Sequence, residues 1–202
     1  MLVVVGGHSR KIGKTSVAEG IIRRLPARNW TAVKITQSGH GICGHDGRRG
    51  EWRPSPGRPY ALSEEREPGE GDSARFLRAG ARRAFWLRTE AGQLAAALPA
   101  LRRILADSEN ALLESNSVME YLRPDVYLMV LDFGSEDFKP SALRFMDRAG
   151  AFVIVDRGFN VPMWREVSRG LWDGKPHFPA RPPDYVSEAL ADFVASAGSG
   201  AV

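Results

Sequence analysis

The chain has 202 residues, of which 43% are hydrophobic and 26% are charged, and this balance is typical of globular proteins. It excludes a fibrous or wholly disordered protein, and no apolar run reaches the roughly 18–20 residues that a membrane-spanning helix needs. The 28 basic and 24 acidic residues leave a net charge of +4. Because the excess is small and scattered, it disfavours nucleic acid as the main partner.

The length fits one domain covering residues 1–202. The apolar start at Met1–Val5 follows no basic region, so we expect no signal peptide. The single cysteine, Cys43, cannot form an internal disulfide, which favours a reducing, cytoplasmic location. We expect no membrane partner.

Strands and helices alternate along most of the chain. Apolar runs typical of strands buried on both faces predict strands at 2–5, 30–36, 83–88, 110–114, 125–132 and 151–156. Helical spacing and cap residues predict helices at 15–25, 72–80, 89–106 (capped by Thr89), 141–148 and 184–195. We interpret 177–179 as a turn. This alternation predicts a three-layer α/β fold, a wound and mostly parallel sheet with helices on both faces.

Residues 37–71 differ in kind, because they are crowded with Gly, Pro, Arg and Glu and carry no periodic apolar pattern. So long an irregular stretch is typical of a functional lid, and we interpret it as a flap or insertion. It contains a cluster of His40, Cys43 and His45, with Asp46 beside it. Such side chains can bind Zn²⁺, although the Gly-rich setting favours a solvated loop.

The most specific pattern lies between the first strand and the first helix, where a phosphate-binding loop belongs. Five residues separate the first Gly from Gly-Lys-Thr, one more than in the common form. The loop backbone would form an anion nest, assisted by the positive end of the helix. Lys14 would reach the β- and γ-phosphates, and Thr15 would hold Mg²⁺. The nucleotide-binding residues expected here are Gly7, His8, Ser9, Arg10, Lys11, Ile12, Gly13, Lys14, Thr15 and Ser16.

Two related families of phosphate-loop NTPases resemble this chain. The five-residue spacing resembles that of dethiobiotin synthetases. The order of motifs over residues 2–156 resembles the MobB family of molybdopterin-guanine dinucleotide biosynthesis adaptors. Its marks here are a strand with Lys34 followed by His40 and His45, an Asp-Ser helix running into Ala79-Gly80-Ala81, and a strand ending at Glu114. Ser115 stands where that family usually has Gly, and Asp156-Arg157 replaces an Asn-Lys-x-Asp guanine signature.

Four acidic residues are further site candidates. Glu114 ends a buried strand at the carboxyl edge, where ligands bind in α/β sheets, and we expect it to hold Mg²⁺ and to act with Lys14 in catalysis. Asp132 is a weaker Mg²⁺ candidate, with a purely structural role as the alternative. Asp156 could accept hydrogen bonds from guanine, which would favour GTP over ATP. Asp72, with Arg75, opens a helix either as a cap or as part of the γ-phosphate site.

These features suggest a GTP-binding, or ATP-binding, adaptor with slow Mg²⁺-dependent hydrolysis. The MobB resemblance implies a partner enzyme, a molybdenum-cofactor nucleotidyltransferase. A ligase or small-molecule kinase similar to dethiobiotin synthetase is the first alternative, with 37–71 as its substrate lid. A nucleotide-dependent metal chaperone is the second, which Ser9 disfavours because such NTPases often carry a lysine there. A homodimer is compatible with the sequence.

Overall fold

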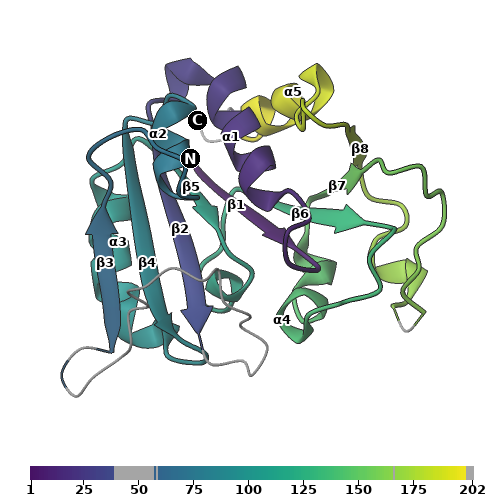
Figure 1. The fold of residues 1–202 in the computed structure, drawn as a ribbon, viewed down its shortest axis with the longest axis horizontal. Helices are drawn as coiled ribbons and strands as arrows, with labels where there is room; N and C mark the ends of the chain where they lie inside the picture. The colour runs from purple at the N-terminus through teal and green to yellow at the C-terminus, as the bar shows by residue number, and fades with distance from the viewer. Residues whose placement is uncertain (39–56, 58, 166, 199–202) are drawn as a thin grey trace.

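The computed structural model describes residues 1–38, 57, 59–165 and 167–198. Within these ranges, one 8-stranded sheet runs in the order β3-β4-β2-β5-β1-β6-β7-β8 (Figure 1). Every neighbouring pair is parallel except β3 and β4, which are antiparallel. Helices cover both faces, so the predicted α/β fold is confirmed.

The elements have the following bounds. The strands are β1 (Leu2–Gly7), β2 (Trp30–Ser38), β3 (Tyr60–Glu64), β4 (Arg83–Glu90), β5 (Asn110–Glu114), β6 (Val126–Asp132), β7 (Ala151–Val155) and β8 (His177–Ala180). The α-helices are α1 (Lys14–Arg24), α2 (Ala74–Arg78), α3 (Leu98–Ala106), α4 (Pro140–Leu143) and α5 (Glu188–Ala197). Short 3-10 turns are η1 (Pro26–Arg28), η2 (Leu94–Ala97), η3 (Ser117–Glu120), η4 (Met146–Arg148) and η5 (Arg169–Leu171).

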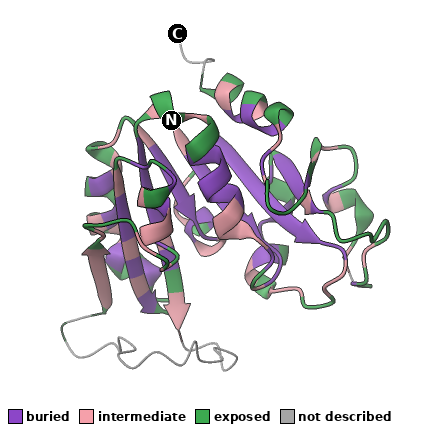
Figure 2. Ribbon diagram, turned by 45° about the horizontal axis from the view of Figure 1, so that its top comes forward, coloured by how far each residue is buried: buried purple, intermediate pink, exposed green. Residues whose placement is uncertain are grey.

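The central strand β1 shows why the sheet strands are apolar throughout. Side chains alternate between the two faces of a strand, so Val3 and Val5 pack with α1, α2 and α5, whereas Val4 packs with α3 and α4. All three are fully buried. Because helices cover both faces, no position in the middle of β1 meets water. Figure 2 shows the same pattern, with a buried sheet beneath half-exposed helices.

Three local predictions were wrong. The stretch 37–71 is not irregular throughout, because Tyr60–Glu64 forms the edge strand β3 against β4. Thr89 does not cap a helix but extends β4, and a turn at Gly92 (φ 78°) precedes η2 and α3. Residues 177–179 are not a turn, because they pair with β7 as strand β8. Edge strands are short and partly solvated, so they carry little apolar periodicity to reveal them.

The carboxyl edge of the sheet brings three segments together. Strands β1, β5 and β2 are neighbours, and the register pairs Val5 with Glu114 and Glu114 with Lys34. Helix α1 begins directly above this edge (Figure 1). The topology therefore gathers the loop after β1, the end of β5 and Lys34 of β2 at one place. No helix in the described part of the chain is long and apolar enough to cross a bilayer.

Candidate functional site

The loop between β1 and α1 depends on glycine at two points. Gly13 adopts the left-handed conformation (φ 94°), and an added Cβ would lie 2.6 Å from the ring of Tyr185. At Gly7 a Cβ would lie 2.9 Å from side-chain carbons of Ile12 and Lys14. These close approaches let the loop fold tightly over the start of α1, as the Gly-rich pattern predicts.

Asn116, just beyond β5, anchors the start of this loop. Its Oδ1 accepts a hydrogen bond from the Gly7 N–H (2.8 Å), and its Nδ2 donates to the Gly7 carbonyl (2.9 Å). Both backbone polar groups of the buried Gly7 are thereby satisfied by one side chain. The sequence analysis did not single out Asn116, and its only signal is a polar residue two positions after Glu114.

His8 points into the protein. Its Nε2 accepts from the Asp132 N–H (2.9 Å), so its Nδ1 carries the proton and donates to the Asp137 carbonyl (2.9 Å). Burial lowers the pKa of His8, which keeps the ring neutral, while the carbonyl of Asp137 opposes this shift. The His8 ring is stacked on Phe138 and contacts Trp164. The imidazole therefore anchors the loop to the segment after β6.

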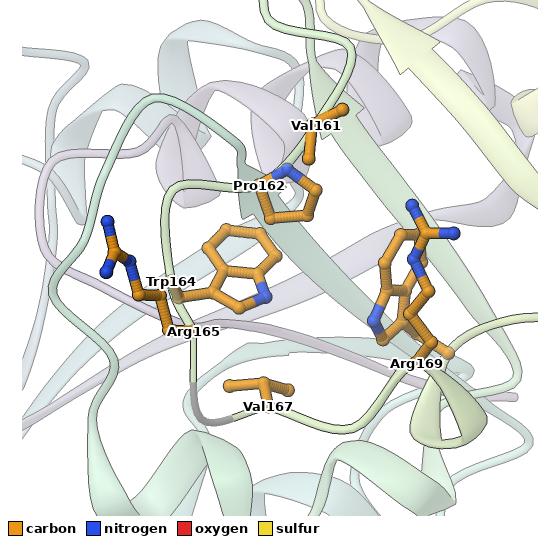
Figure 3. Close-up of a pocket in the computed structure, with 7 residues that line it drawn as sticks. Val161, Pro162, Trp164, Arg165, Val167 and Arg169 are labelled. Carbon is orange, nitrogen blue, oxygen red and sulfur yellow. The ribbon is translucent and has the colours of Figure 1, made fainter.

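Trp164 also lines a cavity of about 200 Å³ beside this anchor. Figure 3 shows its indole between Pro162 and Val167, with Arg165 and Arg169 on opposite sides of the view. Because Trp164 contacts both this cavity and His8, the cavity adjoins the phosphate loop.

Lys14 bends back along the loop. Its Nζ donates to the Ser9 carbonyl (2.5 Å), and the Ser9 hydroxyl donates to Asp137. Burial lowers the pKa of Lys14 to about 8; Glu114 opposes this shift, and the nearby ammonium groups of Lys139 and Lys34 add to it. Cations that converge in this way repel one another, and a bound anion relieves the repulsion. The remaining loop side chains differ in exposure: Arg10 is half-buried, Lys11 exposed and Ile12 buried.

A second cluster lies directly beside Lys14. The Thr15 hydroxyl donates to Oε2 of the buried Glu114 (2.8 Å), so the structure joins the two residues expected to bind Mg²⁺. Lys34 Nζ donates to Glu114 Oε1 (2.5 Å) and Thr15 Oγ1 (3.1 Å) and pairs with Asp72 (3.0 Å). Burial lowers the pKa of Lys34, but Glu114 and Asp72 outweigh it and raise the pKa above its ordinary value. The sequence did not predict that Lys34 takes part in this cluster.

Arg75 connects this cluster to α1. It forms an ion pair with the buried Glu19 of α1, and its guanidinium lies 3.5 Å from the Ser16 hydroxyl and 3.9 Å from Asp72. These contacts fix α2 against α1. Asp72 is thereby held at the site, and the N-cap position of α2 belongs to its neighbour Ser73.

Two other candidates lie apart from the cluster. Asp132 ends β6, on the opposite side of β1 from β5, where its carboxylate binds Arg157 (2.7 Å) and the Gly134 N–H (3.0 Å). Asp156 follows β7 and accepts from the Gly158 N–H (3.0 Å) and Arg181 (2.9 Å), and these two bonds lower its pKa. The structure thus does not bring Asp132 to Thr15.

The Zn²⁺ candidates His40, Cys43 and His45, with Asp46, lie outside the described residues. Within the described part of the chain, no group of three His, Cys, Asp or Glu side chains is placed to hold a metal ion. The Thr15 cluster offers two carboxylates and one hydroxyl. Such a partial set suits Mg²⁺, which usually keeps several waters and takes further oxygens from a phosphate substrate.

No family model and no curated protein sequence matches the chain. Among solved structures, HypB from Helicobacter pylori in complex with nickel is similar, with a TM-score of 0.51 and 14% identity over 96% of this chain and 85% of HypB. The "apo" form of LpxK from Aquifex aeolicus in complex with ATP has a TM-score of 0.49 and 18% identity over 88% of this chain.

The chain spans 53% of the LpxK chain, about half of its length. At these identities the likeness concerns the fold alone. That likeness agrees with the loop between β1 and α1 and with the parallel sheet around it. The chain therefore has the fold of the phosphate-loop NTPases.

Proposed function

We propose that this chain binds a Mg²⁺–nucleoside triphosphate at the loop Gly7–Ser16 and hydrolyses it slowly. The observation that carries this proposal is the cluster of Thr15, Glu114 and Lys34 next to Lys14. It lies at the carboxyl edge of β1, β5 and β2, where open α/β sheets bind their ligands.

The anion-binding half of the site is the loop itself. Its backbone turns over the first residues of α1, and the free N–H groups at that helix end favour a negative charge. Lys14 adds a buried ammonium that can leave the Ser9 carbonyl for a phosphate oxygen. These residues bind and orient the triphosphate.

The oxygen atoms around Thr15 fit Mg²⁺. A hydroxyl and two carboxylates, from Glu114 and Asp72, already surround one cation, the Lys34 ammonium. Mg²⁺ prefers hard oxygen ligands of this kind. When bound, the ion would neutralise charge on the phosphates.

Slow hydrolysis follows from the engagement of both carboxylates. Glu114 and Asp72 pair with Lys34 in the free protein and would both bind Mg²⁺ when nucleotide is present, so neither is free to activate water as a strong general base. Slow turnover suits an adaptor or switch. We expect GTP as the nucleotide, because Asp156 lies beyond β7 with acceptor oxygens that suit a guanine edge.

The finer role in this proposal is a MobB-like adaptor. The order of motifs from β1 to β7 supports it, and the partner would be a nucleotidyltransferase of molybdenum cofactor biosynthesis. Mixing the chain with such an enzyme and GTP should then raise the rate of nucleotide attachment. An unchanged rate, with GTP binding intact, would contradict the adaptor role but not the proposed nucleotide site.

Two alternatives have specific support. The five-residue spacing between Gly7 and Gly13 favours a ligase or small-molecule kinase, in which nucleotide turnover requires a carboxylate acceptor. The fold similarity to HypB, whose structure holds nickel, favours a metal chaperone. That activity would depend on His40, Cys43 and His45, and metal stoichiometry in Cys43→Ser against wild type would test it.

A panel of GTP, ATP, GDP and ADP with Mg²⁺ separates these functions when melting temperature and phosphate release are both measured. Ligands that bind only the folded state raise its stability, so we expect the triphosphates to raise the melting temperature in the presence of Mg²⁺. Phosphate release without an added acceptor supports the adaptor. Release that depends on a small carboxylic acid supports the ligase or kinase.

A further inference from the structure

The ammonium of Lys34 lies inside a shell of three oxygen atoms. These are Glu114 Oε1 at 2.5 Å, Asp72 Oδ2 at 3.0 Å and Thr15 Oγ1 at 3.1 Å. The side chain of Lys34 is 15% exposed and that of Glu114 only 3%. The shell contains the oxygen donors that the proposed function assigns to Mg²⁺.

We propose that Lys34 is a built-in counter-cation, whose ammonium holds the metal position in the nucleotide-free protein and excludes Mg²⁺ until nucleotide arrives. This inference rests on the proposed function for the identity of the metal. An ammonium and a divalent cation cannot share one oxygen shell, because like charges at such a distance repel strongly. One must therefore leave before the other binds.

The charges explain why the position needs a cation. Glu114 and Asp72 carry two negative charges next to a hydroxyl, and Glu114 is buried. A buried charge without a partner is strongly destabilising, so Lys34 stabilises the cluster in the free protein. Removing its charge would leave two carboxylates with affinity for another cation.

The geometry also explains how Lys34 can leave. Its ammonium is a compact charge on a flexible side chain. The side chain of Asp72 is 55% exposed, so it forms the open side of the shell. Free Mg²⁺ has to displace an ammonium that is already in place. Mg²⁺ that arrives with a triphosphate brings negative charge, which lowers the cost of moving Lys34. Metal binding is thereby coupled to nucleotide binding.

The test measures Mn²⁺ binding to the nucleotide-free protein by electron paramagnetic resonance, with Mn²⁺ in place of Mg²⁺. Lys34→Met should bind Mn²⁺ about tenfold or more tightly than wild type, because two carboxylates lose their internal partner. Lys34→Arg should behave as wild type. The matched control is Lys175→Met, which removes one positive charge that binds the Ala149 carbonyl just before β7 and should also behave as wild type.

Equal Mn²⁺ affinity in Lys34→Met and wild type overturns the proposal. The gain should disappear in the double variant Lys34→Met/Glu114→Gln, and a gain that persists there also overturns it, because the ion then binds elsewhere. If Lys34→Met is unstable, Mg²⁺ should raise its melting temperature but not that of wild type. If Mg²⁺ does not raise the melting temperature of Lys34→Met, the proposal is also overturned.

None of these measurements uses nucleotide, so the two proposals fail separately. A wild-type protein that binds no Mg²⁺–nucleotide, together with a Lys34→Met variant that gains a Mn²⁺ site, contradicts the proposed function alone. A wild-type protein that binds Mg²⁺–nucleotide, together with a Lys34→Met variant that gains no site, contradicts the role of Lys34 alone.

Discussion

The side-chain amide of Asn116 binds both backbone polar groups of Gly7, accepting from its N–H (2.8 Å) and donating to its carbonyl (2.9 Å). This pair of hydrogen bonds ties the start of the phosphate loop to the end of β5, two residues beyond Glu114. The anion-binding loop and the proposed metal ligand are therefore fixed to each other through one short segment. A change at Asn116 should disturb both.

Asn116→Ala should destabilise the protein by about 2–3 kcal/mol, because it leaves a buried N–H and a buried carbonyl without partners. Urea unfolding of the variant and of wild type measures the difference. Asn160→Ala, at an exposed position in the loop before η5, is the matched control and should change the free energy of unfolding by less than about 0.5 kcal/mol. Equal values for the two variants would contradict this account.

The stability of the protein should fall in acid partly through His8. Burial lowers the pKa of His8 in the folded state, so the neutral ring is the folded form. Its contribution is complete above about pH 6.5, the ordinary value for histidine, and is lost as the pH falls below that. His8→Gln, which keeps a donor and an acceptor, should flatten this part of the pH profile.

The control for the pH experiment is His177→Gln, which alters an exposed residue of β8. The free energy of unfolding of all three proteins is measured by urea titration from neutral pH to pH 5. A profile for His8→Gln that is as steep as that of wild type would show that His8 is not responsible.

Thr15→Val should remove the Mg²⁺ dependence of nucleotide binding. Valine keeps the shape of threonine but has no hydroxyl for the metal, and Glu114 loses a hydrogen bond worth about 1 kcal/mol. Calorimetric titration with nucleotide, with and without Mg²⁺, measures the effect. Thr15→Ser retains the hydroxyl and should keep the Mg²⁺ dependence. If Thr15→Val binds Mg²⁺–nucleotide as well as Thr15→Ser does, Thr15 is not a metal ligand.

The sequence predicted the central sheet well because strands that are buried on both faces are apolar at every position. Val3 to Val5 meet helices on both sides, so every position had to be apolar. The glycines of the loop were equally clear, because the close approaches at Gly7 and the positive φ at Gly13 require them. Edge strands β3 and β8 have one solvated side and too few residues to show a period.

The contacts that complete the site could not be predicted because they join distant parts of the chain. Asn116 is 109 residues from Gly7, and Lys34 is 80 residues from Glu114. Only the strand order and register place them together. Asp132 and Glu114 are both acidic residues at the end of a buried strand. They lie on opposite sides of β1, and no local sequence pattern distinguishes them.

Asp156→Asn should weaken GTP binding by about tenfold or more and leave ATP binding unchanged, since an amide replaces one acceptor oxygen with a donor. The fit depends on Arg181 and the Gly158 N–H, which orient the carboxylate. Competition between GTP and ATP for a fluorescent nucleotide measures the preference. Equal losses for both nucleotides would place Asp156 outside base recognition.

Nucleotide binding by wild type and Lys14→Ala, measured by calorimetry with Mg²⁺, tests the central claim most directly. Lys14 contacts only the loop carbonyl of Ser9 among the hydrogen bonds of the described residues, so alanine should leave the melting temperature of the free protein nearly unchanged. We expect wild type to bind GTP or ATP and Lys14→Ala to lose this binding. Affinity in Lys14→Ala equal to that of wild type, or a wild-type protein that binds neither nucleotide, would contradict the assignment of the phosphate loop.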